Sequence, residues 1–154
     1  MKKLLFFGSI LLLFNACGAK KVTATKAIMS TKEKLTLVFN KYENTPYRYG
    51  GTDSNGFDCS GFVQKAYLDA FNINIPRTTK ELITTGEKVR KNQYKIGDLL
   101  FFKPSKKYHH VGIYFGNGTF IHSGSSTGVT KTNLNNSYWK KHYLSARRIL
   151  NSKK

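Results

Sequence analysis

The spacing of hydrophobic residues changes twice along this chain of 154 residues. An apolar run fills residues 4–14, and a stretch of mostly small and polar residues follows over residues 18–30. Over residues 31 to about 44, apolar positions recur every three or four residues, which predicts an amphipathic helix. A similar stripe covers residues 62–71, so we predict a second helix with Cys59 at its start.

Beyond Gly97 the pattern becomes that of β-strands. We predict strands over residues 98–102, 110–115, 119–123 and 144–150, a short helix over residues 79–86 and a helical turn near residues 138–142. Helices followed by an antiparallel sheet are typical of an α+β domain, and this is the fold class that we predict.

The second helix has a clear start signal after the loop over residues 46–56. Asp58 is a good N-cap residue, because its carboxylate can accept a hydrogen bond from the first helical turn. Phe57 and Phe62 occupy the two positions of a hydrophobic staple, which fixes the angle at which the chain enters a helix. Both signals place Cys59 in the first turn.

The first residues have the features of an export signal. Two lysines precede an apolar run that is too short to span a bilayer but suits the core of a signal peptide. The run ends in Phe14-Asn15-Ala16-Cys17, which resembles the lipobox of bacterial lipoproteins. We therefore expect a signal peptide over residues 1–16, a lipidated Cys17 that opens a tether over residues 17–30, and a catalytic domain over residues 31–154. A cleaved signal without lipid is the alternative.

The formal charge of +18 suggests a polyanionic neighbourhood. Export argues against nucleic acid, which leaves wall polymers and membrane head groups as partners. Solvated lysines without a specific partner would give the same composition.

Cysteine usage turns Cys59 into a candidate nucleophile. If Cys17 carries a lipid, Cys59 has no disulfide partner in this chain. A free thiol has a pKa of about 8.5, and the positive end of a helix dipole favours the thiolate form. The N–H groups of the same helix end could also hold the oxyanion of a tetrahedral intermediate. Such a nucleophile still needs a base.

Histidine is the natural base, and the sequence offers two candidates on neighbouring strands. His110 begins the segment HVGIYF, in which Gly112 leaves space beside its ring, whereas the adjacent His109 points to the opposite face. His122 lies in the next strand. The remaining histidine, His142, is in a basic aromatic segment and is interpreted as a surface or packing residue.

The register of the hairpin decides whether His110 and His122 meet. A two-residue turn at Asn117-Gly118 would place their rings on opposite faces of the sheet. A three-residue turn over residues 116–118, or a bulged equivalent, would make them diagonal neighbours on one face. We predict this second register, which permits a Cys–His–His relay. Each residue could instead have a purely structural role, and zinc bound by Cys59, His110 and His122 is a further alternative, although no closely spaced ligand pair supports it.

At this point the motifs resemble those of the NlpC-type cysteine peptidases of bacterial cell walls. The segment TPYRYGGTDSNGFDCSGFV is similar to the family's nucleophile region, and IPRTT, KIGDLLFF, HVGIYFGNGTFIHS and YWKKHYLSARRIL are similar to its later blocks. The resemblance implies a papain-like fold in which Cys59 is the nucleophile, His110 the base and His122 the polar third residue. It also implies hydrolysis of peptidoglycan stem peptides between D-γ-glutamyl and a diamino acid.

The resemblance implies further site residues. Tyr47 matches the family's active-site tyrosine, and Asp58 and Ser60 flank the nucleophile, where they help to shape the substrate cleft. Each has a plainer reading, because Tyr47 could be a packed loop aromatic and Asp58 a helix cap. Arg77 could contact a substrate carboxylate or form a structural ion pair. Glu81 departs from the glutamine-rich helix of many members.

Together these observations predict an exported, lipid-anchored murein endopeptidase that faces the cell wall. We expect a monomer that needs no metal and no cofactor, contacts stem peptides, and reaches the membrane through Cys17. An amidase or acyltransferase on the same scaffold, and a wall-binding lipoprotein with a vestigial site, are the alternatives.

Overall fold

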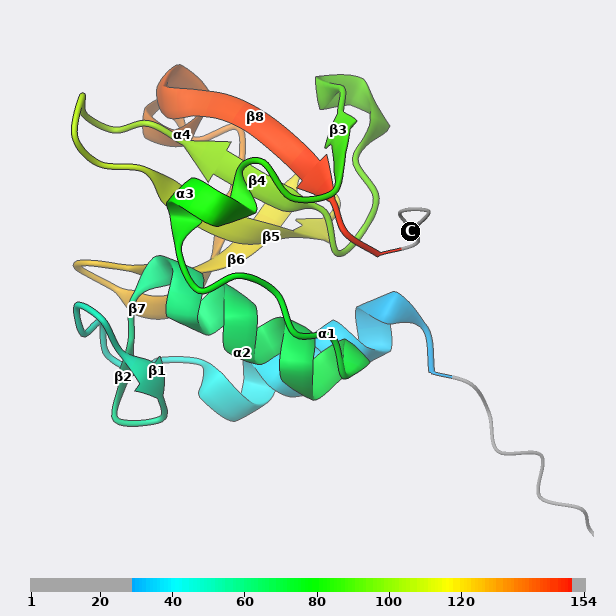
Figure 1. Cartoon of the computed structure of the whole chain (residues 1–154), viewed down its shortest axis with the longest axis vertical. Helices are drawn as coiled ribbons and strands as arrows, with labels where there is room; N and C mark the ends of the chain where they lie inside the picture. The colour runs from blue at the N-terminus through cyan, green and yellow to red at the C-terminus, as the bar shows by residue number, and fades with distance from the viewer. Residues whose placement is uncertain (1–28, 151–154) are drawn as a thin grey trace, which may run out of the picture.

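The computed structural model describes residues 29–150, so the predicted signal peptide, the lipidation site and most of the tether lie outside the described residues. Two longer helices precede the main sheet, which has six strands. Figure 1 shows the helices α1 and α2 beside this sheet. The helices are α1 (Thr31–Tyr42), α2 (Cys59–Phe71), α3 (Thr79–Leu82) and α4 (Ser137–His142), with a 3-10 turn at Lys91–Gln93. The strands are β1 (Thr52–Asp53), β2 (Gly56–Phe57), β3 (Glu87–Val89), β4 (Leu99–Phe102), β5 (His110–Gly116), β6 (Thr119–Gly124), β7 (Gly128–Asn133) and β8 (Tyr143–Arg148).

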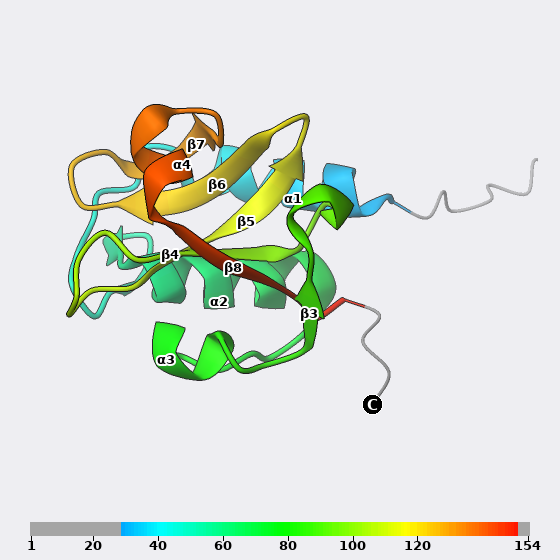
Figure 2. The same cartoon turned by 90° about the horizontal axis from the view of Figure 1, so that it is seen from above.

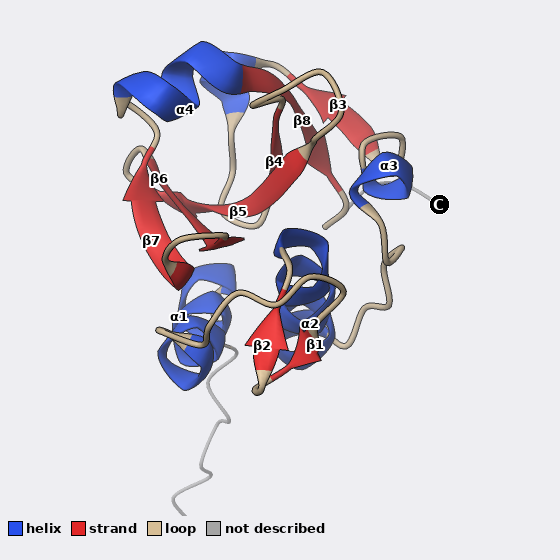
Figure 3. Cartoon of the chain, turned by 90° about the vertical axis from the view of Figure 1, so that its left-hand side faces the viewer, coloured by secondary structure: helices blue, strands red, loops and turns tan. Residues whose placement is uncertain are grey.

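The main sheet has the strand order β3-β8-β4-β5-β6-β7, and every neighbouring pair is antiparallel. It is curved, with α1 and α2 on one side and α4 on the other (Figures 2 and 3). The predicted α+β class is confirmed. Among residues 29–150, no helix combines the length and hydrophobicity needed to cross a bilayer.

The first helix begins with a capping box. The side chain of Ser30 accepts a hydrogen bond from the backbone of Glu33, and the carboxylate of Glu33 accepts one from the backbone of Ser30. The helix ends at Tyr42 rather than near Asn44, because the chain turns there and Asn44 takes a positive φ of 66°. Its predicted apolar face is the buried one, formed by Leu35, Val38, Phe39 and Tyr42.

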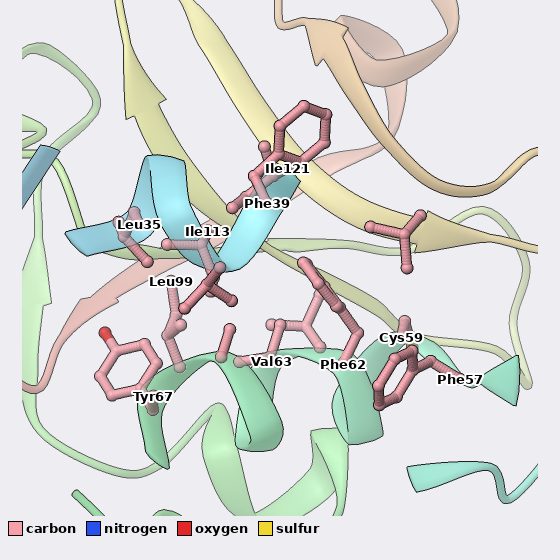
Figure 4. Close-up of a cluster of buried hydrophobic side chains, with 14 of the residues drawn as sticks. Leu35, Phe39, Phe57, Cys59, Phe62, Val63, Tyr67, Leu99, Ile113 and Ile121 are labelled. Carbon is pink, nitrogen blue, oxygen red and sulfur yellow. The ribbon is translucent and has the colours of Figure 1, made fainter. Parts of the chain in front are cut away.

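The second helix starts as the sequence predicts. Asp58 Oδ1 accepts a hydrogen bond of 2.7 Å from the N–H of Gly61, so Asp58 is the N-cap. The rings of Phe57 and Phe62 pack edge to face with centroids 5.9 Å apart, which confirms the staple. Figure 4 shows Phe57 and Cys59 at this end of α2, with Val63 and Tyr67 further along the face that packs against the sheet.

The two faces of the sheet carry separate hydrophobic clusters. The larger cluster lies between the sheet and helices α1 and α2, and it includes Cys59 and the side chains shown in Figure 4. The smaller one lies on the other face, where Phe102 and Phe120 pack against Trp139 of α4. Because strand side chains alternate between faces, β5 contributes Val111 and Ile113 to the first cluster. Its other face is left for His110.

The hairpin between β5 and β6 combines the two alternatives that the sequence left open. The turn has two residues, Asn117 and Gly118, both with positive φ, and it pairs Gly116 with Thr119. A bulge beside the turn then shifts the register, so that Tyr114 pairs with Phe120. The predicted register is thus reached by its bulged equivalent.

Several elements differ from the predictions. Helix α3 ends at Leu82 rather than at Gly86, because the N–H groups of Thr84 and Thr85 bond three residues back and tighten the chain into turns. The sequence pattern does not predict strands β1, β2, β3 and β7. In β7, Val129 is the only large apolar residue that is buried, so its hydrophobic pattern is weak.

Candidate active site

Cys59 occupies the first position of α2 and is 5% exposed. Its Sγ has two hydroxyl neighbours: the Tyr108 hydroxyl, which donates to it at 3.9 Å, and Thr79 Oγ1 at 3.8 Å. Within the described part of the chain it forms no disulfide. Cys59 is therefore a free, largely buried thiol at a helix N-terminus, and it contacts the loop that leads into β5.

His110 and His122 form a buried pair. Nε2 of His110 lies 3.0 Å from Nδ1 of His122, and the two rings meet edge to face with centroids 4.9 Å apart. The predicted meeting of the two rings on one face of the sheet is confirmed. Nε2 of His122 in turn lies 3.0 Å from Oγ1 of Thr132 on β7.

The surroundings of the pair keep both rings neutral at neutral pH. Burial lowers the pKa of His110 from 6.5 to about 4. Burial, and then the neighbouring His110, lower the pKa of His122 to about 2. Aromatic rings enclose the pair. The ring centroid of Trp139 lies 5.0 Å from that of His110 and 4.9 Å from that of His122. Phe120 stacks on His122.

With both rings neutral, the hydrogen bonds from His110 through His122 to Thr132 can be arranged in one way that leaves His110 free to act as a base. If Nε2–H of His110 donates to His122, then Nε2–H of His122 donates to Thr132, and Nδ1 of His110 is left to accept a proton. His110 is the first residue of β5, at the strand end nearest the loop that holds Tyr108. In the described residues the partners of Cys59 Sγ are hydroxyls and not His110, which suits a resting state in which the catalytic hydrogen bond is unformed.

Tyr108 connects the two halves of the site. Its hydroxyl bonds to Cys59, and its ring centroid lies 6.3 Å from that of His110. Burial raises the pKa of Tyr108, and the neighbouring Cys59 and Tyr47 raise it further. The phenol is therefore protonated at neutral pH and able to donate.

Asp58, Ser60 and Arg77 form one network beside the nucleophile. Arg77 holds the carboxylate of Asp58 with both terminal nitrogens, at 3.0 and 2.7 Å, and donates to Ser60 Oγ at 2.9 Å. Burial acts to raise the pKa of Asp58, but hydrogen bonds from Arg77 and Gly61 outweigh it and hold the pKa below its usual value. Of the two roles proposed for Arg77, the structure contains the ion pair.

Tyr47 lines the same region as Cys59 and Asp58. A parallel bridge to Phe57 fixes its backbone beside the start of α2. Burial raises the pKa of its hydroxyl, and hydrogen bonding with Tyr108 offsets part of that rise. Tyr47, Asp58, Ser60 and Arg77 are thus brought together around Cys59, and their contact with substrate stays a prediction.

Two hollows meet at Tyr108. The first, called the cysteine hollow here, has a volume of about 390 Å³ and is lined by Cys59, Tyr47, Asp58, Arg77, Tyr108 and His109, among others. The second, the histidine hollow, has a volume of about 340 Å³ and is lined by His110, His122, Thr132, Tyr108 and Trp139, among others. Each hollow lies within the size range of small-ligand sites, and together they flank the candidate reacting groups.

Sequence reasoning missed Thr132, Tyr108, Trp139 and Thr79. Thr79 lies in the IPRTT segment and Trp139 in the YWKKHYLSARRIL segment, but no local pattern marks any of the four as a site residue, and each reaches the site only through the fold. In residues 29–150 no group of three His, Cys, Asp or Glu side chains is arranged to hold a metal ion, so the zinc alternative gains no support there. His142 lies at the end of α4, where its Nδ1 is 2.8 Å from the carbonyl of Tyr138.

A cysteine at a helix N-terminus, together with a hydrogen-bonded histidine pair on an antiparallel sheet, is the arrangement typical of a papain-like cysteine peptidase. The comparison with known families agrees with this class. The chain belongs to the NlpC/P60 family, whose model matches residues 44–148. The resemblance noted in the sequence is thereby confirmed.

Individual relatives span most of the chain. A "probable endopeptidase NlpC homolog" of Haemophilus influenzae is 40% identical over 84% of this chain and 69% of its own length. The "murein DD-endopeptidase MepS/murein LD-carboxypeptidase" of Escherichia coli K12 is 38% identical over 79% of this chain and 65% of its own length. The solved structure of an NlpC/P60 family protein from Bacillus cereus is 34% identical, with a TM-score of 0.70, over 77% of this chain and 40% of that one.

Proposed function

We propose that this protein is a peptidoglycan endopeptidase that hydrolyses amide bonds in stem peptides by a Cys–His–His mechanism. The observation that carries the proposal is the 3.0 Å contact between His110 and His122, with Tyr108 linking His110 to Cys59. Family membership and the names of the relatives support the substrate class. The favoured bond, between D-γ-glutamyl and a diamino acid, rests on the family resemblance.

Acylation begins when Nδ1 of His110 takes the thiol proton of Cys59. The sulfur attacks the carbonyl carbon of the scissile amide, and the oxygen becomes an oxyanion. N–H groups of the first turn of α2 and the hydroxyl of Tyr47 are the candidate donors to that oxyanion. The C–N bond then breaks as His110 passes the proton to the leaving amine, which gives a thioester on Cys59.

Deacylation uses the same groups in reverse. His110 takes a proton from water, the resulting hydroxide attacks the thioester carbonyl, and the C–S bond breaks. The proton on His110 returns to the sulfur, so the products are a carboxylic acid and the free thiol. His122 holds the ring of His110 in the orientation and tautomer that both steps need.

The cellular setting is proposed from residues that precede the described part of the chain. A lipid on Cys17 would hold the domain at a membrane surface that faces the wall, and residues 17–30 would serve as a tether to a catalytic domain over residues 31–154. The positive charge would favour anionic wall polymer, an attraction that weakens as salt rises. We propose that the domain acts as a monomer.

A digest of purified peptidoglycan tests the function. We expect fragments whose masses show a new glutamyl carboxylate and a new amine on the diamino acid. Release of whole stem peptides would instead indicate an amidase, and newly formed amides an acyltransferase. Cys59→Ala and His110→Ala should abolish cleavage with unchanged circular dichroism, and continued cleavage by either variant would reject the mechanism.

A further inference from the structure

Tyr108 covers the candidate nucleophile. Its hydroxyl lies 3.9 Å from Cys59 Sγ, its ring rests against His110, and it lines both hollows. A carbonyl carbon must come within about 3 to 3.5 Å of the attacking sulfur before reaction. The phenol occupies the space next to the sulfur, so an acyl group needs Tyr108 to turn aside.

The position of Tyr108 also separates the two sides of the site. Substrate on the side of Tyr47 and Arg77 would fill the cysteine hollow, and substrate on the side of Trp139 would fill the histidine hollow. A ligand that fills one hollow can leave Tyr108 in place. A peptide that continues through both must displace it, and contacts in both hollows supply the binding energy for that displacement.

The loop that carries Tyr108 suits an anionic partner. It connects β4 to β5 and exposes Lys103, Lys106 and Lys107. None of the ion pairs within residues 29–150 involves these three lysines. Stem peptides carry free carboxylates, so substrate that binds this loop can move the loop and Tyr108 together.

We propose that Tyr108 is a specificity-determining residue, which closes the site over Cys59 and favours peptides that extend on both sides of the scissile amide over short amides that extend on one. The inference rests on the proposed function for its substrate class. The cover over Cys59 is a separate physical property, and it can be measured without any hydrolysis.

The experiment compares the wild-type full chain with Tyr108→Ala and Tyr108→Phe. The first readout is the rate of alkylation of Cys59 by iodoacetamide, followed by peptide mass mapping so that Cys17 is scored separately. If the open state is populated at about 10% or less, removal of the side chain should raise this rate about tenfold or more. Tyr108→Phe keeps the ring and should raise the rate only severalfold, as expected for the loss of one hydrogen bond of about 1 kcal/mol.

The second readout is kcat/KM for a short γ-D-glutamyl anilide and for a purified crosslinked muropeptide. Tyr108→Ala should raise kcat/KM for the anilide about tenfold while that for the muropeptide changes less than about threefold. Leu37→Ala, on the exposed face of α1, is the control and should change neither readout. Thermal melting shows whether each variant is folded. If Tyr108→Ala does not fold, Tyr108→Phe still provides the test.

An unchanged alkylation rate in both folded variants would show that Tyr108 does not cover Cys59. Equal changes in kcat/KM for the two substrates would overturn the role in specificity. If the wild type cuts neither substrate, the proposed function fails together with the specificity role, and the alkylation rates still decide whether Tyr108 covers Cys59.

Discussion

The buried histidine pair predicts a steep loss of stability in mild acid. Unfolding releases His110 and His122 into water, where each has a pKa near 6.5. In the folded protein the pKa of His110 is about 4 and that of His122 about 2, because burial disfavours the charged form. The unfolded state therefore binds more protons below pH 6.5, and stability falls as the pH falls through that value towards about 4.

The magnitude follows from the distance between the assay pH and 6.5. At pH 5 both rings stay neutral in the folded protein, and pH 5 lies 1.5 units below 6.5. At about 1.36 kcal/mol per pH unit, each ring therefore lowers the free energy of unfolding by about 2 kcal/mol relative to neutral pH. The pair together costs about 4 kcal/mol, which is a large part of the 5–15 kcal/mol typical of a folded domain. Carboxylates contribute little to this change, because they titrate at lower pH.

Urea unfolding between pH 5 and pH 7.5 measures this effect. His122→Gln keeps an amide group that can bond to His110 but removes one titrating ring, so the pH-dependent loss should fall to about half, or about 2 kcal/mol. His142→Gln, at the end of α4, is the matched control and should retain the full loss. A free energy of unfolding that is flat over this range, or the same pH dependence in His122→Gln and wild type, would refute the reasoning.

Three further predictions concern the geometry around the site. Thr132→Val removes the hydroxyl that bonds to Nε2 of His122, and we expect kcat to fall about tenfold, equivalent to about 1.4 kcal/mol, with little change in KM. An unchanged kcat would show that Thr132 does not contribute to the relay. Gly112→Ala would place a Cβ 2.6 Å from the Phe120 ring and 3.0 Å from His122 Cβ, so a loss of about 1–3 kcal/mol by urea unfolding and a reduced kcat are expected; wild-type values for both would contradict the packing. Asp58→Asn should keep the oxygen that caps the helix and lose both the ion pair with Arg77 and the bond from the N–H of Gly50, whereas Asp58→Ala loses the cap as well. Urea unfolding should therefore find the alanine variant less stable than the asparagine variant by about 1 kcal/mol, and equal stabilities would show that the cap contributes nothing.

The sequence predicts the parts of the site that local patterns control. The cap at Asp58 and the staple of Phe57 and Phe62 are encoded within a few residues, and they place Cys59 at the start of α2. The alternation in β5 likewise assigns His110 to the face opposite the helix-packed core. Such features depend on neighbours in sequence, so they can be derived before the fold is known.

The rest of the site depends on contacts between distant segments. Thr132 reaches His122 because β7 pairs with β6, yet β7 has too few large apolar residues to be recognised as a strand. Tyr108 lies in an irregular loop, and only the fold brings its hydroxyl to Cys59. The sequence also does not decide whether Arg77 contacts a substrate carboxylate or forms an ion pair, because it does not show which carboxylate lies near Arg77 in the fold. In the structure that carboxylate is Asp58.

Stoichiometric modification of Cys59 tests the central claim most directly. Partial alkylation of the full chain, with peptide mass mapping of Cys59 and Cys17, gives the modified fraction of each thiol alongside residual hydrolysis of purified peptidoglycan. Hydrolysis should fall in proportion to the modified fraction of Cys59 and reach zero when every molecule is modified there. Hydrolysis that persists after complete modification of Cys59 would contradict the account.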